Sequence, residues 1–167
     1  MDFRISGLEA GEFTHLFGLS DAALARHRAR RYACDGKPGF PCRVSLEDAE
    51  PGESVLLVNY EHLPVDSPYR ASHAIYVRER IQPAFAAVNE VPPALRTRLL
   101  SVRALDAKGM MLDADIAEGR NLAPLVARLF ANEATAYLHA HFARRGCFAA
   151  RIDRGQTPIF PIGAGRR

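Results

Sequence analysis

The sequence contains no tryptophan, only three cysteines and, among its 22 basic residues, only two lysines. Cys34, Cys42 and Cys147 are too few for the disulfide framework of a small secreted domain, so we expect free thiols. No apolar run approaches the roughly 18 residues of a membrane-spanning helix. Asp2 and Arg4 interrupt the position where a signal peptide would have its apolar segment. These absences predict a cytoplasmic protein with no membrane partner.

Common enzyme signatures are absent as well. There is no His-Glu-x-x-His or Cys-x-x-Cys spacing for zinc, and no Gly-x-Ser-x-Gly elbow surrounds Ser67 or Ser72. The basic run over residues 26–31 lacks the aromatic residues and the motifs typical of nucleic-acid binding. An excess of arginine over lysine is typical of proteins encoded by GC-rich bacterial genomes. We therefore predict a bacterial protein that binds no nucleic acid.

The composition that remains is that of a folded protein. The chain has 167 residues, of which 48% are hydrophobic and 25% are charged, and its formal net charge is +3. This length is typical of one domain with a core of its own. We predict a single domain over residues 1–167, with residues 155–167, rich in proline and glycine, as an extended or flexible tail.

Two apolar runs flank a polar segment in the middle of the chain. Residues 54–61 are predicted to form an interior strand, because residues 55–58 are apolar on both faces. Residues 71–79 resume strand character after a loop with two prolines. A hairpin symmetric about Asp66 would pair Leu57 with Ile75 and would place Asn59 beside His73.

A second hairpin is predicted between residues 98 and 116. With Ala107-Lys108-Gly109 as its loop, Ala104 pairs with Leu112, and Arg103 lies opposite Asp113 on the solvated face.

A long helix is predicted to follow, from Asn121 to about Arg145 with Gly146 as its end. Apolar residues form one stripe on this helix, and Glu133 lies within the stripe, where a carboxylate needs a partner such as Arg43, Arg70 or His73. The alternative is that Glu133 lies at a solvated edge. The predicted fold is α+β: an antiparallel sheet of about five or six strands with one long helix from the C-terminal half packed on it.

The candidate site combines the 59–73 segment with this helix. We predict His73 and Glu133 as catalytic candidates for proton transfer. A small anionic ligand, either a carboxylate or a phosphate, would be held by basic, polar and aromatic groups. These ligand-binding candidates are Arg43, Asn59, His62, Tyr69, Arg70 and His141.

A metal centre is the competing chemical interpretation. On a helix, His139 and His141 point about 160° apart and cannot chelate one ion, so we assign no metal ligand and predict no cofactor. A site that uses His73 and His141 with Glu133 or Asp66 stays open as a metal-dependent alternative. Adjacent strand residues point to opposite faces, which argues against a Ser72–His73 nucleophile pair.

Four segments carry a resemblance to a known family: CRVSLEDAEPGE, NYEH, SPYRASHAIYVRE and HAHFARRGCFAARID. Together they resemble the bacterial family named domain of unknown function 1203, over nearly the whole chain. The resemblance implies one stand-alone domain and carries no activity, substrate or catalytic residue.

The sequence thus favours a protein that binds a small anion in a pocket lined by arginine, histidine and glutamate, and it does not decide whether the protein is an enzyme. The alternative is a structural or protein-interaction module, a homodimer without catalysis, in which the same polar groups satisfy one another.

Overall fold

The computed structural model describes residues 1–155, so the predicted tail lies, apart from Gly155, outside the described residues. The strands are β1 (Phe3–Ser6), β2 (Ala29–Ala33), β3 (Ser54–Leu63), β4 (Ala71–Arg78), β5 (Ala86–Val88), β6 (Leu99–Leu105), β7 (Met111–Glu118), β8 (Tyr137–Phe142) and β9 (Phe148–Arg154). The helices are α1 (Asp21–Arg26), α2 (Pro93–Arg96) and α3 (Leu122–Phe130), with 3-10 turns η1 (Ala10–Glu12), η2 (Thr14–Leu16) and η3 (Gly119–Asn121).

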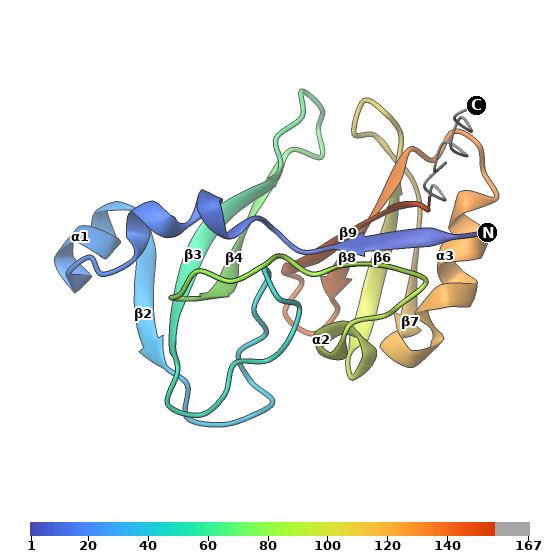
Figure 1. Cartoon of the computed structure of the whole chain (residues 1–167). Coiled ribbons are helices and arrows are strands. Elements are labelled where there is room, and N and C mark those ends of the chain that lie inside the picture. The colour runs from blue at the N-terminus through green and yellow to red at the C-terminus, as the bar shows by residue number, and fades with distance from the viewer. Residues whose placement is uncertain (156–167) are drawn as a thin grey trace, which may run out of the picture.

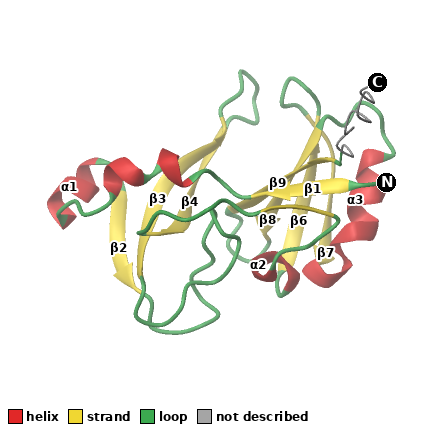
Figure 2. Ribbon diagram, in the orientation of Figure 1, coloured by secondary structure: helices red, strands yellow, loops and turns green. Residues whose placement is uncertain are grey.

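The strands form two antiparallel sheets. A six-stranded sheet has the order β5-β1-β9-β8-β6-β7, and a three-stranded sheet has the order β2-β3-β4. Figure 1 shows the smaller sheet beside α1 and the larger sheet beside α3, with β4 and β9 nearest to each other. Figure 2, coloured by secondary structure, shows how little of the chain is helical. The predicted antiparallel sheet of about five or six strands therefore forms, and the structure adds a second, three-stranded sheet.

The predicted long helix over residues 121–145 is wrong. Helix α3 ends at Phe130, a turn follows, and residues 137–142 form strand β8 in the middle of the six-stranded sheet. Every residue of β8 is buried. The prediction fails because it continues the helical spacing of the apolar residues of α3 past Phe130, over residues 137–142, where apolar and polar residues alternate with period two. No helix among residues 1–155 is long and apolar enough to cross a bilayer.

One face of the six-stranded sheet packs on α3. Val102 of β6 and Leu138 and Ala140 of β8 are fully buried with Val126 and Phe130 of the helix in one apolar cluster. Because side chains alternate along a strand, Tyr137, His139 and His141 of β8 point to the opposite face. That face is directed to the three-stranded sheet, where Phe148 of β9 joins the apolar cluster of β3 and β4.

The β3–β4 hairpin forms, but its predicted register is wrong by one residue. Asn59 pairs with Ala74, and Tyr60 pairs with His73. At the loop end Leu63 pairs with Ala71, two residues from the predicted register. A β-bulge then reduces the offset to one, because β3 takes two steps from Glu61 to Leu63 where β4 takes one. The extra residue is His62, and it is buried.

The β6–β7 hairpin is also confirmed with a shifted register. Ala104 pairs with Asp113 and Arg103 with Ala114, after an irregularity next to Leu105. The predicted Arg103–Asp113 pair is therefore wrong, and the carboxylate of Asp113 instead binds Arg128 of α3 at 2.9 Å.

The tips of the two hairpins lie next to each other at the top of the view in Figure 1, and a hydrogen bond joins them. The Ser67 hydroxyl donates a hydrogen bond to the Gly109 carbonyl at 3.1 Å. Gly109 has φ +79°, and a Cβ added there would lie 2.5 Å from Cγ2 of Val65. This contact helps to hold the β3–β4 sheet against the larger sheet.

We expect Gly109→Ala to destabilise the protein by about 1 kcal/mol more than Gly52→Ala. Both glycines have a positive φ, +79° and +89°, so both substitutions carry the left-handed backbone cost of about 1–2 kcal/mol. Only at Gly109 does the methyl group also meet a neighbour, because nothing lies within 4 Å of a Cβ at Gly52. Urea unfolding of both variants measures the difference. Equal losses would show that the contact between the tips contributes nothing.

Candidate functional site

Two strands of the three-stranded sheet and one strand of the six-stranded sheet bring four histidines together. His139 and His141 are two residues apart on β8 and share its inner face. His62 is the bulged residue of β3, and His73 lies opposite Tyr60 on β4. A second bulge, in β9 between Phe148 and Ala150, lies beside His141. Bulges commonly redirect a side chain next to a functional site, and here one turns His62 toward β8.

The four imidazole rings lie in mutual contact. The rings of His62 and His73 stack at 4.6 Å between centroids with 3° between their planes. The His141 ring meets both of them edge-on, at 5.1 Å from His62 and 5.3 Å from His73. The His139 ring lies 5.5 Å from that of His62. His62, His139 and His141 each offer a ring nitrogen within 4.8 Å of the other two.

Most of the buried ring nitrogens have no hydrogen-bond partner among the described residues. Both nitrogens of His62, Nδ1 of His73, Nδ1 of His139 and Nε2 of His141 are in this state. A buried polar atom without a partner typically costs 1–3 kcal/mol, so such a group requires an explanation. Five such atoms on four neighbouring histidines indicate a site suited to a ligand.

The imidazoles are neutral at physiological pH. Burial is the main cause that lowers the pKa of His62 to about 4, of His139 to about 3 and of His141 to about 2. Burial also lowers the pKa of the half-buried His73. A neutral imidazole keeps a lone pair on one nitrogen, which is the form that binds a metal ion.

The orientation of His141 is set by the backbone. Its Nδ1 lies 3.0 Å from the carbonyl oxygen of Gly146, which accepts a hydrogen bond from the ring N–H. The lone pair is therefore on Nε2, the buried nitrogen that has no partner. Metal-binding histidines almost always donate their other N–H in this way.

The walls of the site are apolar and its nearby charges are positive. Phe148 stacks on His62 at 5.1 Å and lies 4.9 Å from the His139 ring. Leu63, Leu105 and Tyr137 form a buried cluster at the hairpin-tip side. In residues 1–155, no carboxylate forms an ion pair with any of the four histidines, and the charges that lower their pKa values include Arg103.

Residues 39–154 match the family described as Protein of unknown function (DUF1203). The chain belongs to this family. The DUF1203 match confirms the resemblance carried by the sequence segments, and its range includes all four histidines. No curated protein and no solved structure matches the chain.

The residues predicted to bind an anion divide into two groups. His62 and His141 of this DUF1203 chain lie in the cluster beside His73, whereas the remaining four lie elsewhere. Arg43 is buried, and its guanidinium donates to the carbonyl oxygens of Phe148 and Pro41. Arg70 pairs with Glu61 on the surface at 2.6 Å. Asn59 and Tyr69 are exposed.

Glu133 lies in the turn between α3 and β8, not within a helical stripe. It is exposed and has no ion pair or side-chain hydrogen bond among residues 1–155. Within residues 1–155, therefore, no contact supports the predicted pairing of Glu133 with His73.

His139 is the site residue that the sequence analysis set aside. On the expected helix it would point away from His141, but on a strand the spacing i, i+2 places both on one face. The signal was present in the sequence Tyr-Leu-His-Ala-His-Phe, whose polar residues alternate with period two between residues 137 and 142.

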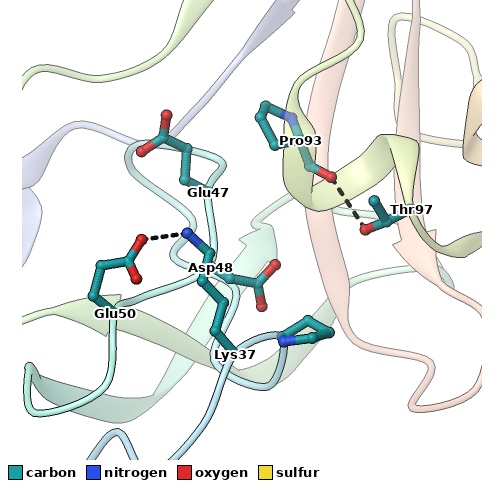
Figure 3. A pocket seen from close by; sticks show the side chains of 7 residues that line it. Lys37, Glu47, Asp48, Glu50, Pro93 and Thr97 are labelled. Atoms are coloured by element: carbon teal, nitrogen blue, oxygen red, sulfur yellow. Dashed lines mark hydrogen bonds and ion pairs between the residues drawn. The ribbon is translucent and has the colours of Figure 1, made fainter.

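A hollow of about 440 Å³ lies elsewhere, between the 37–50 segment and α2. Figure 3 shows its lining, in which Lys37 is paired with Glu50 and the Thr97 hydroxyl donates to the Pro93 carbonyl oxygen at 3.2 Å. Asp48 binds Arg98 through both carboxylate oxygens, at 2.6 and 2.8 Å. Because these charged groups already have partners, the hollow offers less to a ligand than the histidine cluster does.

Proposed function

We propose that this protein binds one divalent transition-metal ion through His62, His139 and His141, with zinc as the first candidate. The observation that carries the proposal is the convergence of three buried, neutral imidazoles whose ligand nitrogens lie within 4.8 Å of one another. Two nitrogens on a tetrahedral zinc ion are roughly 3.3 Å apart, given Zn–N distances of about 2.0–2.1 Å. Small side-chain rotations would bring the nitrogens to that separation.

The donor atoms restrict the kind of metal. Magnesium and calcium require oxygen ligands, and none of the three donors is a carboxylate or a carbonyl. Imidazole nitrogen suits zinc, copper, nickel and iron. The sequence left open a metal site with His73, His141 and a carboxylate. The proposal keeps His141 and replaces the other ligands with His62 and His139.

Three protein ligands leave a fourth position on a tetrahedral ion. Structural zinc sites are closed by four protein ligands, whereas catalytic sites keep one position open for water or substrate. An ion held this way supplies Lewis-acid chemistry and lowers the pKa of a bound water to near 7. His73 falls outside the three-histidine set, and its half-buried ring stacks on His62. Its Nδ1 has no hydrogen-bond partner within residues 1–155. It is placed to hydrogen-bond a molecule in the open position.

We expect the purified protein, prepared without a histidine tag and stripped with a chelator, to bind one equivalent of zinc. Elemental analysis and calorimetric titration measure this. The variant His139→Ala, His141→Ala removes two of three ligands, so its affinity should fall by more than the 10–100-fold typical for loss of an outer-shell partner. His73→Ala should keep the stoichiometry of one.

The chain offers a matched control in its other two histidines. His15 and His27 also lie together, with ring centroids 5.8 Å apart, but both are exposed. The variant His15→Ala, His27→Ala removes the same number of imidazoles and should bind zinc like the wild type. The proposal is contradicted if wild-type protein takes up no transition metal, or if the two double variants bind it equally.

A further inference from the structure

We propose that the open position beside the histidine cluster receives a small oxyanion, a carboxylate or a phosphate, and that Arg103 binds it. This inference rests on the proposed metal site and names the chemical class of its ligand. It assigns anion binding to an arginine other than the two predicted from the sequence, Arg43 and Arg70.

The register of β6 on β8 places Arg103 at the site. Arg103 lies directly opposite His139, and Ser101 lies directly opposite His141. Residues directly opposite on antiparallel strands project from the same face, with Cβ atoms about 4.5–5.5 Å apart. Arg103 and Ser101 therefore extend the face that carries the two histidines of β8.

Among the arginines of residues 1–155 that are not exposed, Arg103 alone has no partner. Arg43 donates to backbone oxygens, Arg98 binds Asp48, and Arg31 binds Glu79. Arg103 has neither an ion pair nor a side-chain hydrogen bond in that range, although it is half-buried. Burial lowers the pKa of its guanidinium, as expected of a cation without a counter-charge.

The charge around the cluster favours an anion. His139 has arginines opposite it on both neighbouring strands, Arg103 on β6 and Arg151 on β9. A bound dication would add two further positive charges to a site that has no carboxylate ligand. A planar guanidinium matches carboxylate and phosphate oxygens with two parallel hydrogen bonds, so one oxygen of the anion can bind the metal and another Arg103.

The sheet leaves a way in for such a ligand. Beyond Arg103 and Ser101, the same face continues onto edge strand β7 with Ala114 and Ile116, their respective partners in register. Both are exposed, and Ile116 keeps 60% of its surface accessible. An anion can therefore reach Arg103 from solvent along this open part of the sheet.

The test uses the full chain loaded with cobalt(II), whose visible absorption reports the ligands on the ion. Acetate and inorganic phosphate are titrated separately at constant ionic strength into wild type, Arg103→Gln and Arg151→Gln. Arg151 is the matched control, because it is also opposite His139 but is bound to Asp153 at 2.8 Å. We expect Arg103→Gln to raise the anion dissociation constant at least tenfold, the order expected for a hydrogen bond to a charged group, and Arg151→Gln to change it about twofold or less.

The outcomes separate the two proposals. A cobalt spectrum that neither anion alters, or that responds equally in both variants, overturns the role of Arg103 and leaves the metal site intact. No cobalt spectrum in wild type contradicts the metal site itself, and this inference with it. If circular dichroism shows that Arg103→Gln does not fold, Arg103→Lys replaces it, because lysine keeps the positive charge but cannot make two parallel hydrogen bonds. If Arg103→Lys binds the anion as tightly as the wild type, the role of Arg103 is overturned. A response to one anion alone identifies the class.

Discussion

Between pH 7.5 and pH 5 the metal-free protein is expected to lose several kcal/mol of its free energy of unfolding. Burial lowers the pKa of His62, His139 and His141 to about 4, 3 and 2, against about 6.5 in an unfolded chain. Below pH 6.5 the unfolded chain therefore binds protons that the folded chain does not bind. Stability is fully present above pH 6.5 and falls as the pH falls toward the folded pKa values.

The magnitude is large because three groups act in the same direction. One pKa unit corresponds to about 1.4 kcal/mol, so each of these histidines contributes about 2 kcal/mol of loss by pH 5. His73 acts in the same direction. The total approaches the 5–15 kcal/mol stability of a typical domain, so the protein should be close to unfolding at pH 5.

Urea unfolding at pH 7.5, 6 and 5 measures this loss. The variant His139→Leu, His141→Leu should lose about 4 kcal/mol less over this range, because leucine does not titrate. His15→Ala, His27→Ala should behave like the wild type. Glu79, whose pKa is lowered to about 2 chiefly by its hydrogen bond with Arg31, loses its contribution only below pH 4.5, outside this window. A stability that stays constant from pH 7.5 to 5 would contradict a buried, neutral cluster.

Arg43→Ala is expected to destabilise the protein by about 3–5 kcal/mol, the size expected when a cavity opens in the core and buried acceptors lose their donor. Arg43 is 1% exposed, and its guanidinium donates to the Phe148 carbonyl oxygen at 2.7 Å and to the Cys147 sulfur at 3.1 Å. It also lies over the Phe142 ring at 4.8 Å. Truncation leaves these acceptors without a donor and opens a cavity.

The same change should weaken metal binding, because Arg43 holds the start of β9. Phe148 is the residue whose carbonyl oxygen Arg43 binds and whose ring stacks on His62. Arg43→Met keeps most of the volume and removes the buried charge, so it should cost less than alanine. The exposed Arg30 provides the control, and Arg30→Ala should stay within about 0.5 kcal/mol of the wild type. Equal unfolding free energies for Arg43→Ala and Arg30→Ala would show that the Arg43 network contributes nothing.

Much of the fold could be predicted from local pattern. The apolar run of β3 and the two hairpins follow the alternation and the turn residues of the sequence, and all three form. The failure at β8 has a local cause. The prediction continues the helical spacing of Leu122–Phe130 into residues 137–142, whose alternation with period two is that of a strand.

By itself, the sequence determined the antiparallel hairpins, the polar segment between β3 and β4 and the membership of a family. Tertiary structure alone decided the site. A bulge at His62 shifts the β3–β4 register by one residue, and a register is set by loop geometry and packing, not by the alternation of apolar residues. His62 and His73 meet His139 and His141 only because two sheets face each other, and no local pattern specifies which faces pack. The same holds for two arginines. Arg43 was predicted to hold a ligand, but its guanidinium binds the carbonyl oxygen of Phe148. Arg103 was predicted on the solvated face, but it lies opposite His139.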